Sequence, residues 1–105
     1  MTTIRHVTVG DTVFYLFRSS GRGSVIRPAI VTSLADVSKL PRLINLHVFF
    51  EADDCEVEDT PVTSSMGTRM EPIRKDMTSH VRMCVEESGS VPPAGRAVWT
   101  FRGPS

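Results

Sequence analysis

The sequence predicts a small all-β domain, an antiparallel barrel or sandwich of about five short strands. Apolar and polar residues alternate with a period of two, turn-forming residues separate the alternating segments, and no segment has a convincing amphipathic helical period. A chain of 105 residues is the size of a single domain with one modest core. The predicted strands are segments 10–17, 27–34, 44–50, 80–86 and 97–101.

The first three strands are the best defined. Both faces of residues 12–17 are apolar, as in a central strand or in a strand with one face covered by a partner. Proline has no N–H to donate, so Pro28 is expected at the start of the second strand. Segment 44–50 alternates throughout, which places Phe49 on the face away from the core. Its inward residues are expected to be Ile44, Leu46, Val48 and Phe50.

Alternation returns towards the C-terminus. In segment 80–86 the apolar residues are expected to face away from Arg82 and Cys84, and segment 97–101 ends the sheet. Across all strands, the pattern predicts a core made of Val13, Tyr15, Ile30, Leu46, Val48, Val81, Val85 and Trp99.

Residues 51–79, here called the arm, lack a sustained period. A structureless connection of this length is uncommon in a compact domain and is usually functional or disordered. We expect an irregular arm whose residues 53–77 are dispensable for folding, because a short turn closes the barrel at little loop-entropy cost. If the protein has a partner, the arm is expected to contact it through Glu51, Asp53, Asp54, Glu56, Met66, Arg69, Met70, Ile73 and Arg74.

Other interpretations of the arm stay open. Its acidic run suits a solvated loop, an ionic contact with a partner, or calcium, although the Gly and distal Glu of an EF-hand loop are missing. Its apolar residues have helical spacing, and they either cover one end of the core or contact a partner, with Pro72 limiting any helix to short turns. The acidic first half and basic second half suit head-to-tail contact between copies, or an internal salt bridge.

Composition and charge argue against several classes of function. The formal net charge is zero, so binding to nucleic acid by bulk electrostatics is not expected. No apolar run is long enough for a secretory signal or a membrane span, so no membrane partner is expected and the default location is the cytoplasm. His6, His47 and His80 are isolated, and no enzyme activity, catalytic residue, metal or other cofactor is expected. Cys55 and Cys84 are expected to be free thiols, with a disulfide as the alternative.

Four segments together resemble a family. They are Gly10–Tyr15, Arg27–Thr32, Ile44–Phe49 and Gly95–Phe101. In this order they resemble small phage-encoded proteins with an SH3-like barrel, most of which have no assigned role. The chain departs from that pattern in the long arm, where a short turn is expected, and in its Trp-Thr-Phe ending, where Trp-x-Trp is expected. The resemblance implies an SH3-like barrel and a phage origin, and it carries no activity.

These expectations lead to a non-enzymatic phage structural or accessory protein that acts by protein–protein contact. A virion component is favoured, such as a capsid decoration (cement) protein or a head or tail accessory protein, made in the cytoplasm of the host bacterium. Its expected partners are major capsid, tail or neck proteins, or copies of itself. The alternative is an intracellular phage effector that binds a host protein or a small signalling ligand. A deep pocket lined by arginine and aromatic residues would favour the effector.

Overall fold

The computed structural model describes residues 6–88 and 97–101, and this part of the chain is all-β with no helix. The prediction of an all-β fold is confirmed. The strands are β1 (Thr12–Ser19), β2 (Gly23–Asp36), β3 (Leu43–Val48), β4 (Glu56–Ser64), β5 (Gly67–Arg74), β6 (Val81–Glu87) and β7 (Val98–Thr100).

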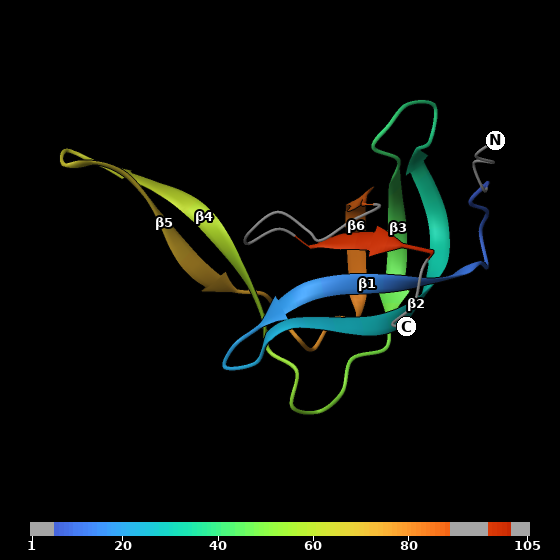
Figure 1. The fold of residues 1–105 in the computed structure, drawn as a ribbon, viewed down its shortest axis with the longest axis horizontal. Coiled ribbons are helices and arrows are strands. Elements are labelled where there is room, and N and C mark those ends of the chain that lie inside the picture. Colours follow the sequence, from blue (N-terminus) through green and yellow to red (C-terminus); the bar gives the residue numbers. More distant parts are fainter. Residues whose placement is uncertain (1–5, 89–96, 102–105) are drawn as a thin grey trace.

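Five strands close into a barrel in the order β1, β2, β3, β6, β7 and back to β1, as expected for a small SH3-like barrel (Figure 1). The long strand β2 makes this closure possible, because its first part pairs with β1 and its second part pairs with β3. All neighbouring pairs are antiparallel except β6 and β7, which are parallel. The expected antiparallel arrangement is therefore correct for every pair but this one.

Pro28 lies inside β2, so the prediction that it begins a strand is wrong. Its carbonyl accepts a hydrogen bond from the Phe49 N–H at 3.0 Å, and hence its nitrogen also points towards β3. Pairing between β2 and β3 starts only at Ala29 and Val48. The missing donor falls just beyond the end of β3, so the sheet lacks only the reciprocal bond to the Phe49 carbonyl at the end of this ladder.

The core is formed by inward residues of the barrel strands together with Val7 from the segment before β1. The cluster comprises Val7, Val13, Tyr15, Phe17, Ala29, Val31, Ile44, Leu46, Val48, Val85 and Trp99. Two predicted core residues are wrong, since Ile30 is 38% exposed and Val81 is 48% exposed. Ile30 lies between the inward residues of β2, and Val81 pairs with the exposed His47.

A bulge in β6 explains why alternation failed there. Ile44 pairs with Val85 and Leu46 pairs with Arg82, so β6 has one residue more than β3 over this interval. Cys84 lies in the bulge and has a positive φ of 52°. As a result Arg82 and Val85 both point inwards, and the expectation that Arg82 faces outwards is wrong.

The arm is not irregular. Residues 56–74 form the β4–β5 hairpin, which is paired in register from Val57 and Arg74 to a two-residue turn after Ser64. Among the described strands, the hairpin pairs with the barrel at its base, where Arg18 and Ser19 of β1 pair with Val57 and Glu56, and it projects from the rest of the fold (Figure 1). This projection accounts for a radius of gyration of 14.6 Å, against about 13 Å for a compact chain of this length.

The first prediction concerns the core. Leu46→Ala should lower the free energy of unfolding by about 2–5 kcal/mol, because Leu46 is fully buried and its truncation leaves a cavity. The matched control is Val81→Ala, which should cost less than about 1 kcal/mol because the side chain is half-exposed. Urea denaturation measures both, and equal losses would mean that the strand faces are assigned wrongly.

Candidate functional site

The β4–β5 hairpin presents both of its faces to solvent. Directly paired residues share a face, so one face carries the residues Val57, Asp59, Pro61, Thr63, Thr68, Met70, Pro72 and Arg74, and is called the Met70 face below. Ile73 lies on the opposite face with the Arg69–Glu71 ion pair of 2.6 Å. The prediction that Met70 and Ile73 share a helical face is wrong, because both lie on strand β5. Side chains alternate along a strand, so two residues that are three positions apart point to opposite faces.

Each long edge of the hairpin carries one proline. The Lys75 N–H donates to the Glu56 carbonyl at 3.0 Å, which makes these two residues a hydrogen-bonded pair. By alternation, the pairs that contain Pro61 and Pro72 are non-hydrogen-bonded, so both ring nitrogens point outwards. A proline at an edge interrupts the donors that an added strand would need. The hairpin is therefore suited to contact through its faces more than through its edges.

A buried charged group, here called the anchor cluster, fixes the base of the hairpin. It consists of Glu56 at the start of β4, Tyr15 on β1, Arg82 on β6 and Lys75 after β5. Glu56 is fully buried. It accepts hydrogen bonds from the Tyr15 hydroxyl at 2.6 Å and from Arg82 Nε at 3.0 Å, and Lys75 Nζ lies 3.5 Å from its carboxylate. Three segments distant in sequence thus meet at one carboxylate.

The remaining donors of the cluster are also satisfied. The Arg82 guanidinium donates to the carbonyls of Ser79 and Val81 at 2.8 and 2.9 Å and lies 4.9 Å from the centre of the Phe50 ring. The Glu56 backbone N–H donates to the sulfur of Met77 at 3.2 Å. Burial, followed by the charge of Glu56, raises the pKa of Tyr15 far above its usual value, so the hydroxyl stays protonated and donates. These groups are engaged with one another and with backbone carbonyls.

A second charged cluster holds the loop between β3 and β4. Arg27 donates from Nε and Nη2 to the two carboxylate oxygens of Asp54, both at 2.8 Å. This fork holds the pKa of Asp54 below its usual range. Around it lie two longer contacts, from Arg27 to Glu51 at 3.3 Å and from Arg22 to Asp53 at 3.2 Å.

The residues predicted to meet a partner fall into three groups. Asp54 and Glu56 are buried and bound within the chain, which contradicts the prediction that they contact a partner. Segment 53–77 contains Glu56 and Lys75 of the anchor cluster, so the structure argues against the expectation that this whole segment is dispensable for folding. Glu51 and Asp53 are exposed in the loop before β4. The others are exposed on the turn and β5 of the hairpin: Met66, Arg69, Met70, Ile73 and Arg74. Sequence reasoning missed Tyr15, Arg82 and Lys75, because nothing in the sequence links them to Glu56.

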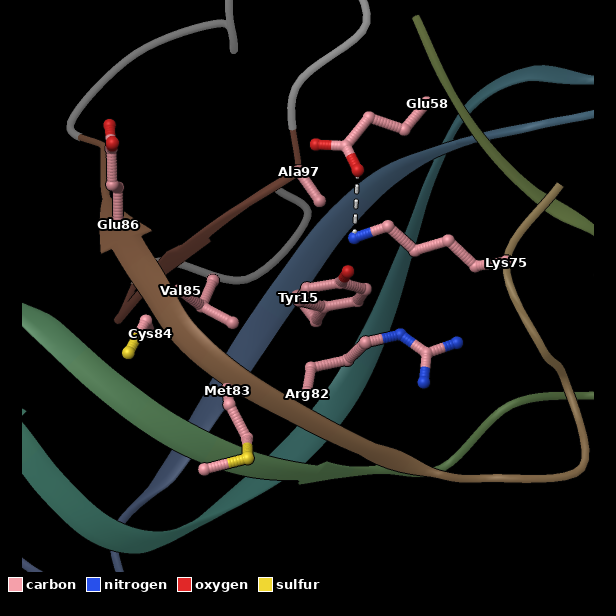
Figure 2. Close-up of a pocket in the computed structure, with 9 residues that line it drawn as sticks. All are labelled: Tyr15, Glu58, Lys75, Arg82, Met83, Cys84, Val85, Glu86 and Ala97. Atoms are coloured by element: carbon pink, nitrogen blue, oxygen red, sulfur yellow. Dashed lines mark ion pairs between the residues drawn. The ribbon is translucent and has the colours of Figure 1, made fainter. Parts of the chain in front are cut away.

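A pocket of about 250 Å³ opens beside the anchor cluster (Figure 2). It is lined by Tyr15, Glu58, Lys75, Arg82, Met83, Cys84, Val85, Glu86 and Ala97. Its two cations already have partners, since Lys75 lies 3.1 Å from Glu58 and Arg82 binds Glu56. An arginine and an aromatic ring line the pocket, as expected for an effector, but an anionic ligand would find Lys75 and Arg82 already paired with Glu58 and Glu56.

In residues 6–88 and 97–101, no group of three or more His, Cys, Asp or Glu side chains is placed to hold a metal ion. Over the same ranges, no helix is long and apolar enough to cross a membrane. Cys55 and Cys84 are both free thiols.

Comparison with known proteins gives no relative to argue from: no family model, curated protein or solved structure matches this chain. The fold and its surfaces therefore carry the functional argument.

The second prediction tests the anchor cluster. Glu56→Gln should lower the free energy of unfolding by about 3–5 kcal/mol, because it leaves the buried Arg82 without its counter-charge. Glu58→Gln is the matched control: it removes an ion pair to Lys75 that is more than one-third exposed, and should cost at most about 1 kcal/mol. Denaturant unfolding compares the two variants, and a similar loss for both would contradict the role given to Glu56.

Proposed function

We propose that this protein is a non-enzymatic structural or accessory protein of a bacteriophage, acting by protein–protein contact through the β4–β5 hairpin. The observation that carries the proposal is the projection of the hairpin, with Met66 95% exposed and Met70 59% exposed. An isolated two-stranded hairpin is marginally stable in water. A hairpin held out from a barrel in this way gains stability when a partner covers one of its faces.

The anchor cluster supports the same proposal. It fixes the direction in which the hairpin leaves the barrel, and a fixed direction lowers the entropy lost when a surface is bound. A rigid barrel that presents one projecting element suits a protein that fills a defined place in a larger assembly. We therefore favour a virion component, such as a capsid decoration or a head or tail accessory protein. Its partners would be major capsid, tail or neck proteins, or other copies of this chain.

The alternative function is that of an intracellular phage effector. The paired cations of the pocket argue against an effector that captures a small anionic ligand. An effector that binds a host protein would use the same hairpin, and it is separated from a virion component by where the protein is found. The localisation to the virion is thus part of the proposal and is tested together with it.

The third prediction uses a shortened hairpin. Residues 59–72 are replaced by Asn-Gly, which joins the paired Glu58 and Ile73 through a two-residue turn and keeps Glu56 and Lys75. The barrel should fold, since its core and anchor cluster are intact. Phage that carry either the natural or the shortened gene are purified, and the protein in the particles is quantified by mass spectrometry. We expect the natural chain to be abundant and the shortened chain to be at least about tenfold depleted, which corresponds to about 1.4 kcal/mol of lost binding.

The outcomes separate the alternatives. The unfolding temperature of the purified shortened chain shows whether any depletion comes from misfolding. If the natural chain is absent from particles, the virion proposal is wrong and the effector is favoured. If the shortened chain is incorporated as well as the natural chain, the contact surface is not the hairpin.

A further inference from the structure

A second exposed surface lies on the barrel, on the outward side of β2, β3 and β6. Ile30, His47 and Val81 are side by side across the three strands. The Phe49 ring lies 5.4 Å from the His47 ring, and Met83 follows Val81 on the same side of β6. These five residues are called the outer patch. Its apolar members are well exposed, with Phe49 at 47%, Val81 at 48% and Met83 at 71%.

We propose that the protein assembles head to tail, with the Met70 face of one hairpin docked on the outer patch of the next copy. The proposal rests on the function proposed above and specifies the partner as a second copy of this chain. The hairpin projects from the barrel and, among the described strands of the barrel, pairs with β1 alone, so it does not cover the outer patch of its own chain (Figure 1). Each copy therefore offers one projecting element and one receiving surface.

The two surfaces have complementary chemistry. The Met70 face presents Pro61, Met70 and Pro72 to solvent, with the exposed Arg74 at its base. The outer patch presents aliphatic and aromatic groups, and the loop that follows Phe49 carries an excess of negative charge, since Glu51, Asp53 and Asp54 face only Arg22 and Arg27. Apolar groups would meet apolar groups, and Arg74 would approach this acidic loop.

The charge of the whole chain favours a second copy over a foreign partner. The formal net charge is zero, so copies do not repel one another at long range. The edge prolines favour face contact and disfavour the open-ended strand pairing that leads to aggregation. A contact between two different surfaces leaves one hairpin and one patch free, and it therefore closes into a ring or extends as a chain.

The face of one hairpin is narrow, so we expect each contact to be weak. Light scattering of the full chain should show an apparent mass that rises above 11.6 kDa with concentration, with association evident by about 1 mM. Met70→Glu places a negative charge among the apolar groups of the outer patch, and Val81→Lys places a positive charge among the apolar groups of the Met70 face. Each variant alone should stay monomeric over the same range.

The decisive measurement mixes the two variants. Met70→Glu has an intact patch and Val81→Lys has an intact hairpin, so a 1:1 mixture should associate again, because that hairpin can dock on that patch and the two changed surfaces carry opposite charges. The matched controls are Val9→Glu and Leu40→Lys, which make the same kinds of change at positions 61% and 70% exposed and should associate like the natural chain. Met83→Lys replaces Val81→Lys if unfolding temperatures show that the latter is misfolded.

Three results would overturn this inference. A natural chain that remains monomeric at about 1 mM has no self-contact, yet the proposed function survives if the shortened hairpin is still depleted from particles. Association that is lost in Met70→Glu but unchanged in Val81→Lys places the receiving surface elsewhere. If both variants are monomeric and stay monomeric when mixed, the hairpin of one copy does not dock on the patch of another, and the inference is wrong.

Discussion

The whole arrangement depends on one buried carboxylate, that of Glu56. Removing a carboxylate from water costs several kcal/mol unless charged and hydrogen-bonding groups offset the loss. Here the offset comes from Tyr15 and Arg82 of the barrel and from Lys75, which follows β5 at the base of the hairpin. Because these groups come from different elements, the carboxylate is stable only when the barrel has closed and both ends of the hairpin are in place. The junction between barrel and hairpin is therefore part of the core.

Beyond this junction the constraints on the hairpin relax. The Arg18–Asp59 pair, with contacts of 2.6 and 3.0 Å, is the next link towards the tip. Past it the exposed side chains contact one another or solvent, as in the Arg69–Glu71 pair. The base of the hairpin is thus fixed by contacts with the barrel, while the side chains near its tip are exposed and available for the partner contact proposed above. The edge prolines narrow the mode of contact, since they leave the faces available while interrupting the edges.

The sequence revealed the barrel better than it revealed the hairpin. Segment 44–50 alternates clearly because one side of β3 meets the core and the other meets solvent. The hairpin has solvent on both sides, so no apolar period marks it, although Thr and Val are frequent in β4 and Gly67 follows its turn. The bulge at Cys84 shifts the alternation by one residue, and such a shift is set by pairing with β3.

The anchor cluster was beyond prediction for a related reason. Glu56 stands among several acidic residues, and only its position opposite Tyr15 and Arg82 in the folded chain distinguishes it from its neighbours. The same holds for Asp54, which is distinguished by the fork from Arg27. In both cases burial reverses the expected role: a residue predicted to face a partner instead stabilises the fold.

Residue-resolved amide hydrogen exchange tests most directly whether the hairpin has a base that belongs to the core and a tip that does not. The Lys75 amide, which donates to the Glu56 carbonyl, should exchange only with unfolding of the whole barrel. Amides near the turn, such as that of Gly67, should exchange through local opening at a much lower free energy. Exchange of the Lys75 amide at the rate of the tip would contradict the role assigned to Glu56, because the base would then open without the barrel.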